Sequence, residues 1–286
     1  MLRSCSPQQE WLSDLSHKAL MPLDQERDKP FWAHLEDLRW HLWRSLIVVL
    51  IFSALAFWKI EWLVGQVLLG PLRRDFPTTV LLCRVGQCPP PFSLRLQATH
   101  PSEQFVKAVV FALSIGLAVA FPYIVWEMWR FVRPGLYRHE RRALKGIVFY
   151  TSLLFTMGVL FAYFVLVPFM LYFFASFRLA DSVENIWRIG DVISLIVQTC
   201  LIVGLVFQMP ILLWGLSQAG LLTARTLRSL RRYAILLAVI LGGILTPSPD
   251  VISQLILAIP LWGLYELSIA IVALSERRRR SYLPIR

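Results

Sequence analysis

Long stretches without a charged side chain are the feature that most constrains how this chain of 286 residues can fold. A helix that crosses a hydrocarbon core about 30 Å thick needs roughly 20 residues, because each adds about 1.5 Å. Apolar residues make up 57% of the chain, a share that soluble domains seldom reach. The uncharged stretches are residues 45–58, 108–126, 146–177, 192–224, 233–249 and, interrupted only by Glu266, 251–275. We therefore expect an all-α integral membrane protein with six transmembrane helices.

The lengths of the stretches predict that the spans differ. The first is long enough if it begins at Leu42 and the Arg44 side chain reaches back to the interface. The fifth, residues 233–245, gives only about 20 Å of helical rise before a proline-rich break. The sixth meets Glu266 about 24 Å along its length. We expect the fifth and sixth spans to be short, with a thinner bilayer or neighbouring helices around them.

Lysines and arginines are distributed unequally between the two ends of the predicted spans. Residues 1–44, 127–145, 217–232 and 275–286 carry six, six, four and five of them. The loops at the opposite end, 59–107 and 171–190, carry eight together. Because the more basic loops stay in the cytoplasm, both termini are expected there. The net charge of +11 then reflects topology and attraction to anionic lipid, and a nucleic-acid partner is not expected.

Three regions follow from these patterns. Residues 1–30 form a polar cytoplasmic tail without a cleavable signal peptide, in which Met21 is an alternative start. Residues 31–275 form the six-helix membrane domain, which begins with an amphipathic helix that runs into the first span. Residues 276–286 form a basic cytoplasmic tail. The proline-rich loop 59–103 is expected to be irregular.

Two cysteines share that loop, outside the cytoplasm. Cys83 and Cys88 stand five residues apart. An external compartment permits a disulfide between them, and two free thiols are the alternative. No histidine stands nearby, so a metal site is not expected.

The sequence lacks the motifs of common enzymes. It has no phosphate-binding Gly-x4-Gly-Lys-Ser/Thr loop and no Gly-x-Ser-x-Gly nucleophile motif. His139 and Glu140 begin like a zinc-protease His-Glu-x-x-His motif, but Ala143 occupies the position of the second histidine. We therefore expect no enzyme activity, no cofactor and no metal.

Polar residues in or beside the spans are candidates for function, because such groups pair or bind a partner. For Gln208, in the fourth span, the alternatives are a helix–helix hydrogen bond and a functional role. For Glu266 they are an ion pair with Arg277 or another arginine, and a role in a pathway. Glu140, the one carboxylate among six basic residues in 130–145, could instead pair locally on the surface.

Six motifs, in order, resemble the TatC family, the multispanning receptor subunit of the twin-arginine protein translocase. They are HLEDLRWHL (34–42), PSEQFVK (101–107), FPYIVWEMWRFVRPGLYRHERR (121–142), GVLFAYFVLVP (158–168), GLVFQMP (204–210) and LTPSPDVISQLILAIPLWGLYE (245–266). The resemblance covers about residues 30–275. The family's six helices, with short fifth and sixth spans, agree with the hydropathy pattern.

The resemblance implies that the chain binds signal peptides with consecutive arginines at the cytoplasmic face. The family's two acidic docking positions fall on Asp37 and Glu140, with Arg39 and His139 beside them. The position of Asp37 is commonly Glu in the family, so the carboxylate here is one methylene shorter. The position of Gln208 is often Glu, and Gln cannot carry a charge.

The resemblance also implies partners and an energy source. TatA-like and TatB-like single-span subunits are expected near the fifth and sixth spans, in a homo-oligomeric complex of the cell inner membrane driven by the proton-motive force. The residues expected to bind these partners are Gln208, Thr246, Asp250 and Gln254. The residues expected to be structural are Pro71, Pro134, Gly135, Pro210 and Glu266.

Two other classes of function remain as alternatives. A small-molecule or ion transporter would use Gln208 and Glu266 as its pathway. An intramembrane protease would require Glu140 for cleavage, but the chain lacks a matching nucleophile or metal set.

Overall fold

The computed structural model describes residues 31–73, 75–84, 96–132, 146–176, 186–245 and 251–282. The chain divides into two compact units, residues 1–44 and 45–286. The described part of the first unit is the start of α2 (Phe31–Trp58). This helix runs without interruption into the first apolar span, as its pattern predicts.

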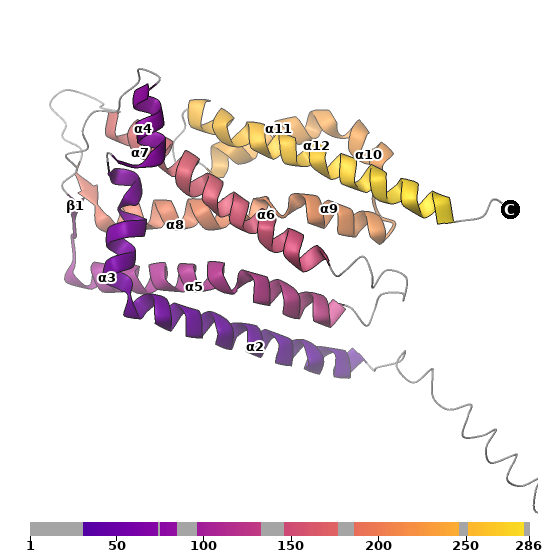
Figure 1. Cartoon of the computed structure of the whole chain (residues 1–286), viewed down its shortest axis with the longest axis horizontal. Coiled ribbons are helices and arrows are strands. Elements are labelled where there is room, and N and C mark those ends of the chain that lie inside the picture. The colour runs from indigo at the N-terminus through magenta and orange to yellow at the C-terminus, as the bar shows by residue number, and fades with distance from the viewer. Residues whose placement is uncertain are drawn as a thin grey trace, which may run out of the picture. The chain divides into compact units, whose positions relative to one another are not determined.

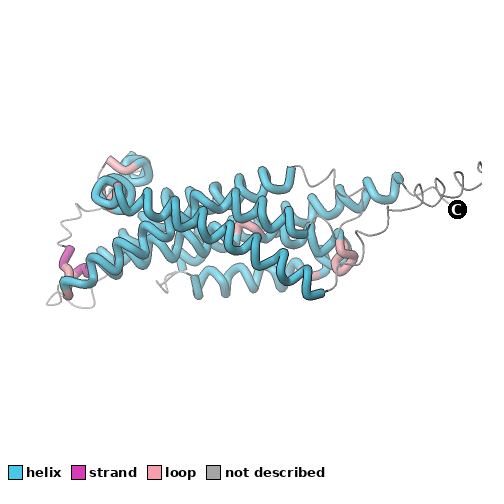
Figure 2. The backbone as a smooth tube through the Cα atoms, turned by 90° about the horizontal axis from the view of Figure 1, so that it is seen from below, coloured by secondary structure: helices cyan, strands magenta, loops and turns pink. Residues whose placement is uncertain are grey.

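Five helical segments in the described part of the chain are long and apolar enough to cross a membrane. They are α2; α5 (Pro101–Val132); α6 (Ile147–Phe161) continued by η5 (Ala162–Leu166) and α7 (Val167–Ser176); α8 (Ile189–Val206) continued by α9 (Met209–Gln218); and α12 (Val251–Tyr282). In the second unit α5, α6, α8 and α12 run along one another (Figure 1). Helices account for nearly all of the described chain (Figure 2). The protein is therefore an all-α, multi-pass membrane protein.

The helix of the predicted fifth span is short, and the sixth is longer than expected. α11 (Arg231–Leu245) has 15 residues, a rise of about 22 Å that falls below the thickness of a hydrocarbon core. It packs against α12 as a hairpin and follows the short helix α10 (Ala224–Ser229). α12 continues past Glu266, and that carboxylate lies 2.7 Å from Arg231. Because α11 is not among the five segments long enough to cross a membrane, six spans stay a prediction.

The loop predicted to be irregular is largely helical in its first half. It contains α3 (Ile60–Leu63), η1 (Val64–Leu68), η2 (Gly70–Leu72) and α4 (Pro77–Arg84). We call residues 60–84, apart from the undescribed position 74, the cap segment. Its Phe76 ring packs against Tyr163 and Phe164 of η5, with centroids 5.5 and 5.4 Å apart. The predicted structural residue Pro71 is buried in η2.

Two hydrogen bonds hold the cap segment on η5. The Tyr163 hydroxyl donates to the carbonyl oxygen of Val67 at 2.6 Å. The Thr78 hydroxyl donates to the carbonyl oxygen of Phe164. Pro168 lies four residues after Phe164 and has no N–H to offer that carbonyl. The Thr78 hydroxyl therefore gives this carbonyl a donor that Pro168 cannot provide.

A two-residue pairing of strands joins the segments that lead into α5 and α8. β1 (Leu96–Gln97) and β2 (Trp187–Arg188) are parallel, with Leu96 opposite Trp187. Glu103, in the first turn of α5, accepts the backbone N–H of Thr99 at 3.0 Å and lies 3.8 Å from Arg188. These contacts fix the two loops to each other at the end of the bundle where α5 and α8 begin (Figure 1).

Small residues let the helices of the second unit approach closely. A Cβ at Gly158 of α6 would lie 2.8 Å from the Phe207 ring and 3.0 Å from the Cα of Gly204. A Cβ at Gly204 of α8 would lie 2.8 Å from Val159 and 2.9 Å from Phe155. Gly116 of α5 similarly has no room for a Cβ beside Ser53 of α2. The buried core fills the space between α6–α7, α8 and α12.

Candidate functional site

The residues predicted to bind a signal peptide fall in different parts of the chain. Asp37 and Arg39 lie on α2 in the unit 1–44, where Asp37 is half-buried and Arg39 is exposed. The predicted site and structural residues that lie outside the described part of the chain are Cys88, Pro134, Gly135, His139, Glu140, Thr246 and Asp250. The roles given to these residues by the sequence therefore stay predictions.

A carboxylate that was not predicted to be functional lies near the end of α5. Glu127 is 1% exposed, and its Oε1 accepts a hydrogen bond from the Tyr123 hydroxyl at 2.9 Å. Arg130, one turn further on, places Nη1 4.0 Å from the same oxygen. The guanidinium of Arg130 also lies over the Trp126 ring, 5.5 Å from its centroid. These four residues form one polar cluster, which we call the α5 cluster.

The α5 cluster shows how a buried carboxylate is accommodated in an apolar helix. A charge in the hydrocarbon region needs donors within the protein, because the lipid provides none. The tyrosine hydroxyl supplies one donor to the buried carboxyl group, whereas the half-exposed Arg130 adds a weaker, solvent-screened attraction. A signal was present in the sequence, since Tyr123, Glu127 and Arg130 stand at i, i+4 and i+7 on one helical face. Glu127 directly follows the apolar stretch 108–126, a position typical of a charged residue that marks the end of a span, so its place in the sequence does not indicate burial.

Gln208 lies at a break in the fourth span. α8 ends at Val206 and α9 begins at Met209, with Pro210 buried in the first turn of α9. The Gln208 side chain is 8% exposed. In the orientation that satisfies both ends of its amide, the nitrogen donates to the carbonyl oxygen of Thr151 at 3.3 Å. The amide oxygen then accepts the N–H of Phe155 at 3.0 Å.

The Gln208 amide thus joins the α8–α9 break to the backbone of α6. Gly204, one turn earlier, provides the close approach of α8 to α6 that this bond requires. This contact is a helix–helix hydrogen bond, one of the two alternatives that the sequence leaves open for Gln208. A role of Gln208 in binding a partner stays a prediction.

Gln254 lies inside the α11–α12 hairpin. Its amide nitrogen donates to the carbonyl oxygen of Val239 at 2.7 Å. Gly242 and Gly243 leave room for this side chain, since a Cβ at either would lie 3.2 Å from one of its atoms. The amide therefore holds the two helices of the hairpin together, and its predicted contact with a partner subunit stays a prediction.

Glu266 forms an ion pair across the same hairpin. The carboxylate oxygen Oε2 lies 2.7 Å from Nη2 of Arg231, the first residue of α11. The sequence named Arg277 or another arginine as its partner, and the structure selects Arg231. The neighbouring Tyr265 hydroxyl donates to the carbonyl oxygen of Leu227 at 2.8 Å. The structural role predicted for Glu266 is thus a link between α12 and the start of α11.

The described cysteines differ in their bonding state. Cys83, in α4, is disulfide-bonded, and its predicted partner Cys88 lies outside the described residues. Cys200, in α8, is a free thiol. Within the described ranges, no group of three or more His, Cys, Asp and Glu side chains is placed to hold a metal ion. Gln208, Gln254 and Glu266 thus link one helix to another, whereas the α5 cluster lies within a single helix.

Comparisons with known proteins extend this picture to almost the whole chain. Residues 33–260 match the family described as Sec-independent protein translocase protein (TatC). The chain is 33% identical over 260 residues to the Sec-independent protein translocase protein TatC of Blattabacterium sp. subsp. Periplaneta americana (strain BPLAN), covering 87% of this chain and 96% of that protein. It is also 33% identical over 252 residues to the TatC protein of Aquifex aeolicus (strain VF5), covering 88% and 98%.

The fold is similar to solved structures of the same kind. A crystal structure described as the twin-arginine translocase receptor TatC in DDM has a TM-score of 0.66 and 33% sequence identity with this chain. The similarity covers 84% of this chain and 99% of that chain. A second crystal structure of the twin-arginine translocase receptor TatC has a TM-score of 0.64.

Proposed function

The chain belongs to the TatC family of Sec-independent protein translocases, and we propose that it is the receptor that binds twin-arginine signal peptides. As a TatC protein it is a membrane component of a protein translocase and not an enzyme. The observation that carries the proposal is the similarity to a structure described as the twin-arginine translocase receptor, which extends over 99% of that chain at 33% identity.

The chemistry of the predicted docking residues suits this task. A guanidinium is a planar fork of donors that binds a carboxylate through two hydrogen bonds, whereas a lysine ammonium is a point charge. We assign the two arginines of the peptide to Asp37 and Glu140, with Arg39 and His139 beside them. Each charged hydrogen bond contributes about 1.5–3 kcal/mol. Loss of the fork geometry at both arginines would therefore weaken binding of a twin-lysine peptide by orders of magnitude.

The positive charge around Glu140 adds selectivity. Residues 130–145 carry six basic side chains and one carboxylate. Such a segment repels cationic peptides in general, so a peptide is retained only when its arginines reach both carboxylates.

The α5 cluster supports this site from the described part of the chain. Glu127, Tyr123 and Arg130 fix the last turns of the helix from which the segment carrying Glu140 departs. The cluster also contains, within one helix, a guanidinium held between a carboxylate and an aromatic ring.

Orientation and energy source belong to the same proposal. The distribution of lysines and arginines supports termini and docking residues on the cytoplasmic side of the inner membrane. The sequence contains no phosphate-binding loop, which is consistent with transport driven by the proton-motive force.

Partner subunits have a suitable surface on α11. Its exposed apolar side chains include Tyr233, Leu236, Leu237 and Ile240. α11 is also shorter than the bilayer core, and a thinner bilayer there favours association of further helices. We place TatA-like and TatB-like single-span subunits against this face, in a homo-oligomeric complex. Thr246, Asp250, Gln254 and Gln208 would support that association.

The transporter alternative finds less support. It requires Gln208 and Glu266 to line one polar path. Gln208 instead contacts the backbone of α6, and Glu266 contacts Arg231.

Export in cells tests the proposal. A bacterium lacking its own TatC would receive this chain and be assayed for export of a folded reporter with a twin-arginine signal peptide. We expect export with the unaltered chain and strong losses with Asp37→Asn and Glu140→Gln. Glu36→Gln is the matched control, because Glu36 is exposed and adjacent to Asp37 but does not occupy the family's acidic docking position. Equal losses in all three variants at equal protein levels would contradict specific docking.

A further inference from the structure

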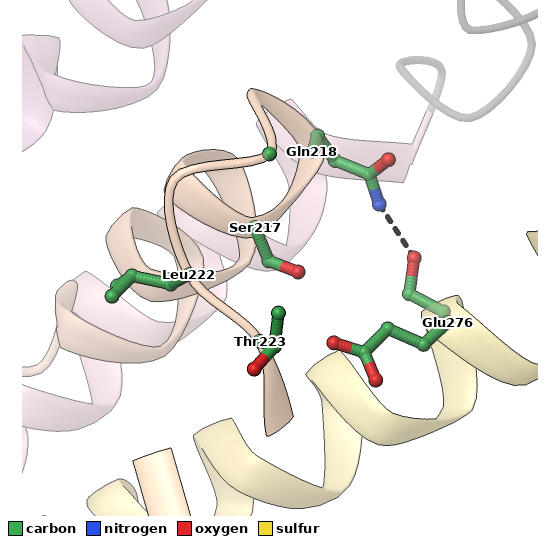
Figure 3. Close-up of a pocket in the computed structure, with 7 residues that line it drawn as sticks. Ser217, Gln218, Leu222, Thr223 and Glu276 are labelled. Carbon is green, nitrogen blue, oxygen red and sulfur yellow. Dashed lines mark hydrogen bonds between the residues drawn. The ribbon is translucent and has the colours of Figure 1, made fainter. Parts of the chain in front are cut away.

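A cavity of about 250 Å³ lies between the α9–α10 turn and the last described turns of α12. Its lining residues are Ser217, Gln218, Gly220, Leu222, Thr223, Ser275 and Glu276 (Figure 3). All of them belong to the second unit. The cavity is at the end of the bundle where α5, α9 and α12 end and α6 begins (Figure 1).

The turn that forms one wall is defined by its backbone. Gly220 adopts a φ of +77°, a conformation that side chains other than glycine rarely adopt. Its N–H donates to the carbonyl oxygen of Ser217, and the N–H of Leu221 donates to that of Leu216. The chain then enters α10, where Thr223 caps the helix by accepting the N–H of Thr226 at 3.2 Å. This wall is therefore fixed without help from a ligand.

Two side-chain bonds join the turn to α12 and form the other wall. The amide nitrogen of Gln218 donates to the Ser275 hydroxyl at 2.5 Å (Figure 3). Oε1 of Glu276 accepts the backbone N–H of Ala224 at 2.8 Å. The Glu276 carboxylate is thus held at the cavity, and one of its oxygens remains for another donor.

The lining groups are mainly hydrogen-bond acceptors. They include the Glu276 carboxylate, the Gln218 carbonyl and the hydroxyls of Ser217 and Thr223. Ser217 is buried although polar. Among the described residues, Glu276 forms no ion pair within 4.0 Å. A carboxylate facing such a cavity repels anions and attracts a cation that can donate hydrogen bonds.

The volume limits what that cation can be. At about 30 Å³ per water, the cavity holds roughly eight waters, and it is smaller than the roughly 300–1,000 Å³ of sites for drug-sized ligands. It therefore suits one side chain and not a whole small molecule. Arginine and lysine are the side chains that combine a positive charge with several donors.

We propose that this cavity, the Glu276 pocket, binds one basic side chain of a peptide docked at the same end of the bundle. The proposal rests on the proposed function, because the peptide is the twin-arginine signal peptide. The Glu276 pocket is then a third site for a positive charge, separate from Asp37 and Glu140. The exposed Arg225, Arg228 and Arg277 near the pocket repel cations that do not reach the carboxylate.

Binding of signal peptides to the purified full-length protein tests the pocket. In a series of peptides with the twin arginines intact, each flanking position would carry lysine in one peptide and glutamine in another. We expect one position where lysine binds about three- to tenfold more tightly than glutamine, the range for a partly exposed charged contact. Glu276→Gln should abolish this difference while leaving the preference for twin arginine over twin lysine unchanged.

Control variants distinguish a specific effect on the Glu276 pocket from loss of the fold and from loss of the receptor function. Glutamine at 276 keeps an oxygen that can accept the Ala224 N–H, so thermal unfolding should remain near wild type. Glu266→Gln alters a carboxylate on the same helix that is already paired with Arg231, and it should keep the lysine effect. In a charge-exchange test, Glu276→Lys should prefer glutamate over glutamine at the identified peptide position.

The outcomes are distinct. A twin-arginine preference without any lysine effect that depends on Glu276 would overturn the pocket and leave the receptor function standing. A lysine effect that depends on Glu276, without a twin-arginine preference, would overturn the receptor function alone. Absence of any peptide binding would overturn both.

Discussion

Thr78 of α4 donates its hydroxyl hydrogen to the carbonyl oxygen of Phe164, the carbonyl that Pro168 leaves without its usual helical donor. The Phe164 carbonyl therefore binds the cap segment, which lies more than eighty residues earlier in the chain. The cap segment is held in place by this bond, by the Tyr163–Val67 bond and by the Phe76 ring.

Removal of the Thr78 hydroxyl should loosen the cap segment. Thr78→Val keeps the shape of the side chain but leaves the Phe164 carbonyl without that donor, which should destabilise the protein by about 1–2 kcal/mol. Thermal unfolding in detergent and limited proteolysis within 60–84 measure the effect. Thr156→Val is the matched control, because the Thr156 hydroxyl bonds only the backbone of its own helix, at Ser152. Equal effects of the two substitutions would contradict the docking role.

The crossing of α6 and α8 should not tolerate a methyl group. Gly204→Ala would place a Cβ 2.8 Å from Val159 and 2.9 Å from Phe155, and overpacking of this kind costs about 1–3 kcal/mol. Gly215→Ala is the control, since a Cβ there meets nothing within 4 Å. That substitution should stabilise α9 by about 0.5–1 kcal/mol, because alanine favours helix. Chemical or thermal unfolding of both variants in detergent measures the difference, and an unaffected Gly204→Ala would contradict the close crossing.

A charge at position 208 should destabilise the protein more than loss of the Gln208 amide does. Thr151 and Phe155 are four apart on α6 and can bond each other when the amide is absent, so Gln208→Leu should cost only about 1 kcal/mol. Gln208→Glu introduces a carboxylate beside the Thr151 carbonyl at an 8% exposed position. It should cost about 3 kcal/mol or more when ionised.

Thermal unfolding at neutral pH ranks the two Gln208 variants. Export of a reporter by Gln208→Leu tests the partner-binding role separately. If export and subunit association are unchanged in that variant, only the helix–helix contact remains.

Thiol labelling should identify the disulfide partner of Cys83. If Cys88 is its partner, labelling of the denatured protein should gain two sites on reduction. In Cys88→Ser the Cys83 thiol should be labelled without reduction. Labelling that reduction does not change would exclude the pairing.

The sequence predicted the spans well because the membrane imposes a length and a composition that any single segment reveals. The apolar stretches coincide with helices, and the short α11 follows from where the proline-rich break stands. What failed depended on contacts between distant residues. The sixth span was expected to be short, but α12 continues past Glu266, which pairs with Arg231, 35 residues earlier in the chain. The cap segment is helical where prolines suggested irregular chain, because η5 offers a surface for Phe76 and Thr78.

The candidate site could be predicted only in part, because its contacts also join residues that are distant in the sequence. Gln208 stood out as polar in an apolar stretch, but its contact with α6 required knowledge of where Gly204 and Gly158 cross. Glu127 follows directly on an apolar stretch, where a charged residue usually marks the end of a span, although its side chain is buried. The Glu276 pocket is formed by segments more than fifty residues apart, and nothing in either segment alone indicates a cavity.

Peptide binding tests the central claim most directly. A labelled twin-arginine signal peptide and its twin-lysine counterpart would be titrated against the purified protein and its Glu140→Gln variant. The account predicts that the unaltered protein prefers twin arginine by at least about tenfold, since loss of one charged hydrogen bond is worth about 1.5–3 kcal/mol. It also predicts that Glu140→Gln removes most of this preference. Equal affinity for the two peptides, or a preference that survives the substitution, would contradict a receptor in which Glu140 recognises guanidinium.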